Sequence, residues 1–273
     1  MLNDTDCIAE GGITVASVSP AWPGHVLSRG SQSSEVARVQ EYLNALRAKY
    51  PTLTSVTVDG KYGSGTETTV KQYQAIAGLQ IDGKVGRNTW DALIGAYNAA
   101  FGGSADTWPG ITLRPGDSSQ DIRHMQQRLN EVARLYTGIN TQTVDGKYGG
   151  NMSAAVRRFQ HQFGLSSDAL LGKSTWNKIV EVYGKMASGR PAPVVTPYPG
   201  YVMSTGTTGD FVRFAQSYLN AISGRPLLTV DGQYGQDTAR RVGAFQASKG
   251  LKVDGKLGRD TWAALIPAFN ATL

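Results

Sequence analysis

Apolar residues near the start of the chain recur at helical spacing. A first helix is predicted over residues 36–46, because four apolar positions lie three or four residues apart, at Val36, Val39, Leu43 and Leu46. A second helix is predicted over residues 69–76, with its inward positions at Val70, Tyr73 and Ile76. The segment between them lacks this periodicity and is predicted to be a loop.

A third helix is predicted over residues 90–97, and its apolar stripe occurs three times in the chain. The stripe has spacing i, i+3, i+4, i+7 and an aromatic residue at each end. Its three versions are Trp90, Leu93, Ile94 and Tyr97; Trp176, Ile179, Val180 and Tyr183; and Trp262, Leu265, Ile266 and Phe269. The repeated stripe indicates that each copy closes its own core as a three-helix unit of about 75 residues, near the lower size limit for independent folding.

A turn motif repeats with the helices. The segment Val58-Asp59-Gly60-Lys61-Tyr62-Gly63 recurs 86 residues later from Val144 and 86 residues later again from Val230. A second Asp-Gly turn, at Asp82-Gly83, precedes the third helix. Glycine supplies positive φ in such turns, and an aspartate accepts bonds from the following amides. Gly63 and Gly86 occupy the expected N-cap positions.

The third copy has a shorter loop before its first turn. In the first copy, Asn44 of the Leu43-Asn44 pair lies 14 residues before Val58. In the third copy, the equivalent Asn220 lies only 10 residues before Val230. We interpret the missing four residues as part of a surface connection that tolerates changes in length.

Domain boundaries follow from the repeats. We predict an N-terminal extension over 1–20 and three repeats over 21–103, 104–190 and 191–273. A glycine-rich linker is expected at 100–107. A stiffer linker is expected at 187–197, because its prolines favour extended backbone.

Composition excludes little beyond a membrane span. The chain of 273 residues has 40% hydrophobic and 18% charged residues, a globular balance, and no apolar run long enough for a transmembrane helix. The net charge of +6 is spread over all three copies, whereas nucleic-acid binders usually concentrate basic residues. The acidic N-terminus has no secretory signal pattern. The single cysteine, Cys7, permits no internal disulfide and is expected to be inert.

These motifs resemble a known family, the helical peptidoglycan-binding domain found beside wall amidases, cortex-lytic enzymes, transpeptidases and phage lysins. The resemblance rests on a helix ending in Q-x-x-L-N, then D-G-x-[FY]-G-x-x-T, an aromatic-Gln pair and a final D-G-x-x-G-x-x-T-W. The first copy carries these residues at Gln40, Leu43, Asn44, Asp59, Gly60, Tyr62, Gly63, Thr66, Tyr73, Gln74, Asp82, Gly83, Gly86, Thr89 and Trp90. The resemblance implies a mainly α fold of three tandem three-helix peptidoglycan-binding-like modules joined by short linkers.

The same resemblance suggests ligand-binding residues around the turns. They are Asp59, Tyr62, Gln74, Asp82, Arg87, Asp145, Tyr148, Gln160, Asp231, Tyr234, Gln246, Asp254 and Arg259. Two alternatives remain open for the uncharged members. The tyrosines could stack on a sugar or fill the base of the core, and the glutamines could bind a wall peptide or the neighbouring turn.

The second copy departs from the pattern at two positions. Met152 replaces the threonine of the first turn motif, and Asp168-Ala169 replaces the second Asp-Gly. If that position requires positive φ, Ala169 costs about 1 kcal/mol or forces a different turn. The second copy is therefore expected to act mainly as a spacer.

The sequence contains no recognisable catalytic or metal-binding pattern. An Asp-Gly turn followed by Lys, Tyr and Gly lacks the spaced oxygen ligands of a calcium loop, so a structural turn is favoured. His25, His124 and His161 align with Ile111, Arg38 and Ala75 of other copies, so they form no repeated metal site. No nucleophile elbow is present, although an unrecognised carboxylate pair stays possible in principle. No cofactor is expected.

The resemblance implies a non-catalytic array that binds cell-wall peptidoglycan. Its expected role is to target or anchor a wall hydrolase, a virion component or a cell-surface component, with no nucleic-acid or membrane partner. A secreted or wall-associated location is expected, in a bacterial, spore or phage setting, and the chain could be a fragment. Two alternatives stay open: a structural or protein-docking scaffold, and a hydrolase with an unrecognised active site.

Overall fold

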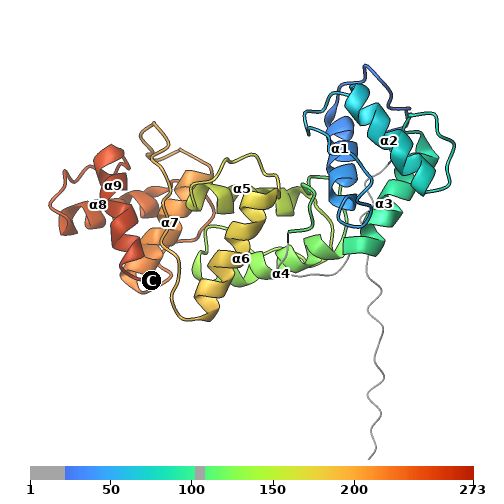
Figure 1. Cartoon of the computed structure of the whole chain (residues 1–273). Coiled ribbons are helices and arrows are strands. Elements are labelled where there is room, and N and C mark those ends of the chain that lie inside the picture. The colour runs from blue at the N-terminus through green and yellow to red at the C-terminus, as the bar shows by residue number, and fades with distance from the viewer. Residues whose placement is uncertain (1–21, 102–107) are drawn as a thin grey trace, which may run out of the picture.

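Nine α-helices form three consecutive modules in the described part of the chain. The computed structural model describes residues 22–101 and 108–273 (Figure 1). Module 1 contains α1 (Ser34–Leu46), α2 (Ser64–Ile76) and α3 (Arg87–Phe101). Module 2 contains α4 (Gln120–Leu135), α5 (Gly150–Gln162) and α6 (Lys173–Ala187). Module 3 contains α7 (Asp210–Ser223), α8 (Gln236–Ser248) and α9 (Arg259–Asn270). The mainly α fold of three three-helix modules is confirmed.

The first helix of each module buries the predicted apolar face. In α1 all four predicted inward residues are buried, from Val36 to Leu46. The start of α1 is fixed by Ser33, whose Oγ accepts a bond of 3.3 Å from the Val36 amide. Ser119 caps α4 in the same way through the Ile122 amide, at 3.0 Å. In every module the first helix packs against the third.

The second and third helices differ in detail from the prediction. The second helix begins at Ser64, five residues before the predicted start, after the N-cap Gly63. Ile76 was predicted to face inward, but it ends α2 and is 39% exposed, so this prediction was wrong. In module 2, Val180 and Tyr183 are only half-buried, and Val182 is buried instead. The stripes of modules 1 and 3 are buried as predicted, except that Ile266 is half-buried.

A short extended segment before the first helix connects both turns of its module. In module 1 the Leu27 amide donates to the Val85 carbonyl oxygen at 3.1 Å, and the Val85 amide donates back at 2.8 Å. Gln32 pairs with Lys61 in the first turn. Equivalent bridges in the other modules are Leu113 with Leu171, Ser118 with Lys147, Met203 with Leu257 and Thr208 with Gln233. These bridges hold the two turns side by side on one end of each module.

Modules 1 and 2 meet in a polar junction that encloses buried charges. Arg38 forms an ion pair with Asp117, and both side chains are nearly inaccessible to water. Arg114 donates two bonds to the Glu41 carboxylate, at 3.0 and 3.2 Å. The Tyr97 hydroxyl donates to the carbonyl oxygen of Pro109. Buried paired charges fix geometry, because separating either partner leaves an unpaired charge.

Modules 2 and 3 share the segment between them. The alternate residues Ala192, Val194 and Thr196 are buried. The Tyr136 hydroxyl of module 2 donates to the Ala192 carbonyl at 2.5 Å, and the indole of Trp262 in module 3 donates to the Thr196 carbonyl at 3.1 Å. The linker therefore packs into both modules, and its extended backbone stays a prediction.

The buried apolar residues of the three modules belong to one continuous cluster. The interpretation that each copy closes a separate core is therefore corrected: neighbouring modules bury each other's surface, and they lie in an elongated row (Figure 1). The domain boundaries remain a prediction. The N-terminal extension 1–20, Cys7 and most of the linker at 100–107 lie outside the described residues.

Candidate functional site

Each turn is held by one buried glutamine from the preceding helix. The Gln40 amide nitrogen donates to the Asp59 Oδ1, the Lys61 carbonyl and the Thr66 Oγ1, at 3.0, 3.0 and 3.1 Å. Its Oε1 accepts from the amides of Asp59 and Gly60, at 3.1 and 2.9 Å. One side chain thus satisfies donors and acceptors on both sides of the turn, which a buried polar group requires.

The second turn of module 1 repeats this arrangement. Gln74 Nε2 contacts the Asp82 Oδ1, the Lys84 carbonyl and the Thr89 Oγ1, at 2.8, 2.9 and 3.2 Å. Its Oε1 accepts from the Gly83 amide at 2.9 Å. Each module therefore contains the same glutamine-turn unit twice. The glutamines are Gln40, Gln74, Gln126, Gln160, Gln216 and Gln246.

A buried tyrosine joins the two turns of each module. The Tyr62 hydroxyl donates to the Gly83 carbonyl at 2.9 Å. Tyr148 bonds Ala169 at 2.7 Å and Tyr234 bonds Gly255 at 2.9 Å in the same way. All three tyrosines are at most 2% exposed. Of the two alternatives, the structure thus gives these rings the role of core residues.

Module 2 keeps its second turn despite the missing glycine. Ala169 adopts φ +56°, and its amide still donates to Gln160 Oε1 at 2.9 Å. Of the two expected outcomes, the strained backbone is therefore the one observed. Met152 removes the hydroxyl acceptor from the first turn of this module, and Gln126 keeps its contacts to Asp145 Oδ1 and the Lys147 carbonyl, at 2.9 and 3.1 Å.

Shallow grooves lie beside these turns. One groove of about 350 Å³ in module 1 is lined by Gln74, Asp82 and Arg87 together with the start of α3. A second, of about 250 Å³, is lined by Gln40, Asp59 and the start of α2. Its counterpart in module 3 measures about 270 Å³ and is lined by Gln216, Asp231 and the start of α8. We call these three cavities the turn grooves.

The turn grooves have a defined electrostatic character. No side chain caps α2 or α8, so the peptide N–H groups of the first helical turn stay available for hydrogen bonds. These groups and the positive end of the helix dipole favour ligands that are anionic or rich in carbonyl groups. Lys61, Lys84 and Arg87 add positive charge around the grooves of module 1. The exposed carboxylates of Asp59, Asp82 and Asp231 line the same grooves.

The turn bonds also fix the ionisation of those carboxylates. A bond from the Lys61 amide, followed by one from Gln40, lowers the pKa of Asp59. The Lys84 amide lowers the pKa of Asp82 despite the opposing effect of burial, and bonds from Gln246 and the Lys256 amide lower that of Asp254. These carboxylates are therefore ionised at neutral pH and accept hydrogen bonds rather than donate protons.

The predicted site residues separate into two groups. The exposed group consists of Asp59, Asp82, Arg87, Asp145, Asp231, Asp254 and Arg259. The buried group consists of Tyr62, Tyr148, Tyr234, Gln74, Gln160 and Gln246. The tyrosines of the buried group fill the core and its glutamines bond the neighbouring turn, so the prediction that these six residues bind ligand through exposed side chains is corrected. Ligand binding by the exposed group stays a prediction.

Sequence reasoning did not select the glutamines of the first turns as site residues. Gln40 and Gln216 line turn grooves as directly as Gln74 does. The signal was available, because Gln40 and Gln126 keep the 86-residue step of the turns they hold. Thr66 and Thr89 likewise line the grooves that their sequence positions flank.

Within 22–101 and 108–273, no group of three or more His, Cys, Asp or Glu side chains is arranged to hold a metal ion. No helix in the same ranges combines the length and apolar character that a membrane crossing needs.

Comparison with known proteins decides the family. The family described as "Putative peptidoglycan binding domain" matches residues 32–93, 118–179 and 208–265, one match in each module. The chain belongs to this family. The matched ranges contain both turns, the first two helices and the beginning of the third helix of each module, so the family pattern and the repeated turn units coincide.

Similar proteins include enzymes that carry further sequence. The chain is 30% identical over 165 residues to a probable N-acetylmuramoyl-L-alanine amidase of Bacillus licheniformis, covering 58% of this chain and 46% of the amidase. It is 36% identical over 90 residues to a zinc D-Ala-D-Ala carboxypeptidase of Streptomyces albus G, covering 33% of this chain and 31% of the carboxypeptidase. The chain thus spans less than half the length of these relatives.

A solved structure is similar to part of the chain. The N-terminal domain of SleB is 32% identical and covers 28% of this chain and 97% of that domain, with a TM-score of 0.25. The shared region has the size of one module.

Proposed function

We propose that the chain is a non-catalytic, multivalent peptidoglycan-binding array that uses its turn grooves to hold an associated wall hydrolase or surface component against the cell wall. The observation that supports it best is the coincidence of three family matches with three modules that each carry the same paired turn units. Peptidoglycan is a polymer of sugars and short peptides, rich in amide and carboxylate groups. Such groups suit the uncapped helix starts and basic rims of the turn grooves.

The fixed arrangement of the modules supports a multivalent role. The junctions through Arg38 and Asp117 and through the 190–199 segment restrict how modules move relative to one another. Linked sites on a repeating polymer increase overall affinity by about 10²–10⁴ when their spacing matches the ligand. Module 2 keeps both turns, so it contributes either a third site or a spacer of defined length.

The ionisation of the turns supports a binding role over hydrolysis. A glycosidase needs one carboxylic acid that stays protonated near neutral pH. Asp59, Asp82 and Asp231 instead have lowered pKa values, and their Oδ1 atoms accept bonds from the turn backbone. The similarity to amidases and carboxypeptidases covers less than half of those enzymes.

Two measurements test this function. Purified murein sacculi should carry the chain into the pellet at moderate salt, whereas a scaffold for a protein partner stays in solution. The same preparation should leave the turbidity of a sacculus suspension constant. Clearing of the suspension by the purified chain would instead establish hydrolysis.

A further inference from the structure

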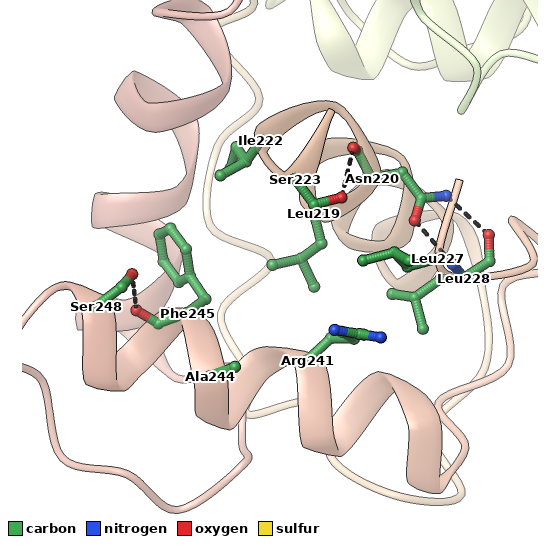
Figure 2. Close-up of a pocket in the computed structure, with 10 residues that line it drawn as sticks. All are labelled: Leu219, Asn220, Ile222, Ser223, Leu227, Leu228, Arg241, Ala244, Phe245 and Ser248. Atoms are coloured by element: carbon green, nitrogen blue, oxygen red, sulfur yellow. Dashed lines mark hydrogen bonds between the residues drawn. The ribbon is translucent and has the colours of Figure 1, made fainter. Parts of the chain in front are cut away.

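The shortened loop of module 3 exposes a pocket between α7 and α8. This pocket, of about 180 Å³, is mainly apolar and is shown in Figure 2. Its lining includes Leu219 and Ile222 of α7, Leu227 of the loop, and Arg241, Ala244 and Phe245 of α8. We call it the module 3 pocket.

In module 1 the longer loop occupies the corresponding region. Leu53 is 2% exposed and belongs to the core. The next residue, Thr54, is tied to α2: its amide donates to Gln72 Oε1 at 2.9 Å, and its carbonyl oxygen accepts from Thr69 Oγ1 at 3.2 Å. Gln72 and Thr69 are the counterparts of Ala244 and Arg241. The loop of module 1 therefore places Leu53 over the region that is open in module 3.

Module 2 has another buried branched aliphatic residue at the equivalent loop position. Ile139 lies 86 residues after Leu53 and is completely buried. Counted back from Val230, the equivalent position of module 3 is Arg225, which is exposed, so no buried aliphatic side chain occupies this position there. Our interpretation of the loop as a surface connection is therefore corrected, because the loop contributes a buried side chain at this position in modules 1 and 2, and module 3 buries only the later loop residue Leu228.

The α8 positions that face the missing loop have changed as well. Ala244 has no polar group with which to hold a loop, and Arg241 replaces a threonine that does so in module 1. The other polar side chains of the pocket are occupied: Asn220 bonds both the amide and the carbonyl of Leu228, and Ser248 bonds the Phe245 carbonyl. Within the described residues Arg241 has no hydrogen bond or ion pair, whereas its neighbour Arg240 pairs with Asp237.

The unfilled apolar space and Arg241, which is unpaired among the described residues, define which chemical groups the module 3 pocket would bind. We propose that the module 3 pocket binds a polypeptide segment of a partner protein that inserts a branched aliphatic side chain next to a carboxylate. The aliphatic group takes the place that Leu53 and Ile139 fill in modules 1 and 2, and the carboxylate pairs with Arg241. Arginine suits this role because its planar guanidinium binds a carboxylate in bidentate fashion.

The pocket is adjacent to a turn groove but differs from it in chemistry. Leu227 and Leu228 line both cavities. The turn groove is polar and bounded by a helix start, whereas the pocket offers aliphatic surface and one cation. A partner segment in the pocket would therefore lie beside murein bound in the groove without replacing it. This site goes beyond the proposed function and does not depend on it.

The test is a titration of the whole ¹⁵N-labelled chain with N-acetyl-leucine, followed by amide chemical shifts. N-acetyl-leucinamide lacks the charge and N-acetyl-alanine lacks the branched side chain, so both serve as ligand controls. Saturating shifts are expected around Leu219, Ala244 and Phe245, with a dissociation constant on the order of 1–10 mM for so small a probe. Residues around Leu53 and Ile139 should not respond.

Substitutions in the module 3 pocket test whether N-acetyl-leucine binds there. Ala244→Leu should fill the pocket and abolish the shifts, and Arg241→Gln should weaken N-acetyl-leucine about threefold or more. Arg240→Gln removes the same charge one residue away and should have no effect. Thermal unfolding of each variant checks that module 3 remains folded.

Several results would overturn the proposal. One is the absence of chemical-shift changes at module 3 up to about 50 mM N-acetyl-leucine. Another is that N-acetyl-leucinamide or N-acetyl-alanine binds as tightly as N-acetyl-leucine. A third is that neither Ala244→Leu nor Arg241→Gln changes the shifts. Both pocket variants should also pellet with sacculi as the unmodified chain does. Loss of pelleting in these variants would assign the pocket to murein instead. The titration contains no murein, so it remains decisive even if the chain fails to bind sacculi.

Discussion

The Tyr62 hydroxyl donates a hydrogen bond of 2.9 Å to the carbonyl oxygen of Gly83, and this bond connects the two turns of module 1. The same relationship recurs between Tyr148 and Ala169 and between Tyr234 and Gly255. Each tyrosine ring is buried, so its hydroxyl reaches the second turn from inside the module. The relative position of the two turns, and with it the shape of the turn grooves, depends on this bond.

Replacing Tyr62 by phenylalanine should therefore destabilise module 1. The change leaves the buried Gly83 carbonyl without this partner, which costs about 1–2 kcal/mol. Denaturant unfolding followed by circular dichroism measures the loss. Tyr50→Phe is the control, because Tyr50 is half-buried and no described hydrogen bond uses its hydroxyl. Equal stability of the Tyr62→Phe variant and the unmodified chain would show that the bond contributes nothing.

Ala169→Gly should stabilise module 2. Ala169 is held at φ +56°, where glycine is favoured by about 1 kcal/mol. The reverse change in module 1, Gly83→Ala, should cost more, because its Cβ would lie 2.6 Å from Lys71 Cε and 2.9 Å from Glu67 Cγ. Thermal unfolding of both variants measures the pair of effects. A lower melting temperature for Ala169→Gly would contradict the strain argument.

Asp210 should control the junction between modules 2 and 3. Its carboxylate bonds Arg158 at 2.7 Å and Arg157 at 3.1 Å. Burial raises the pKa of Asp210, but bonds and charges from Arg158 and Arg157 outweigh that effect and leave it below the ordinary value. The stabilisation is therefore present above the ordinary aspartate pKa of about 4 and is lost as the pH falls through the lower folded value.

Asp210→Asn should loosen this junction at neutral pH. Small-angle X-ray scattering of the whole chain should report a broader distribution of dimensions for the variant. Asp237→Asn is the control, since Asp237 pairs with Arg240 on the exposed surface of module 3. An unchanged scattering profile for Asp210→Asn would mean that the remaining contacts, through the 190–199 segment, Thr137–Ser217 and Asn140–Arg213, suffice to fix the modules.

Asp121 lies in the first turn of α4 and acts electrostatically on Tyr97 of module 1, so it should make the junction between modules 1 and 2 less stable as the pH rises. Burial raises the pKa of Asp121 to about 6, and its Oδ1 has no hydrogen-bond partner among the described residues. The folded chain thus binds a proton more tightly than the unfolded chain, so stability falls between about pH 4 and pH 6 and stays lowered above.

Asp121→Asn should remove that dependence. The expected gain in unfolding free energy is of the order of 2 kcal/mol above pH 6 and vanishes below about pH 4. Melting temperatures at pH 4, 5, 6 and 8 measure it. A gain that is independent of pH, or a loss at pH 8, would contradict burial of the ionised carboxylate as its cause.

The sequence predicted most of the fold because the features that specify it are local. Helical spacing located α1 and α3, and the recurring Asp59-Gly60 motif located the turns. The junctions were not predictable in this way: nothing local indicates that Arg38 pairs with Asp117, 79 residues later. These contacts depend on how modules pack, which no single repeat encodes.

The sequence predicted where the candidate site lies, but not which of its residues are buried within the turns and which are exposed. Motif spacing placed Asp82, Gln74 and Arg87 near one turn, and all three line one groove. The pattern could not show that Gln74 faces inward, because a polar residue that follows an aromatic residue can form hydrogen bonds either with a ligand or with the protein backbone. Burial decides this, and burial depends on the packing of the first extended segment and both turns.

The most direct test of the account is sedimentation with purified murein sacculi at about 150 mM salt. The unmodified chain should pellet, and the double variant Lys61→Ala/Arg87→Ala should bind about tenfold more weakly, because these two exposed cations line the two turn grooves of module 1. Arg134→Ala/Arg190→Ala removes the same charge at exposed positions away from the turn grooves and should bind normally. A chain that stays in the supernatant, or equal loss in both double variants, would contradict binding through the turn grooves.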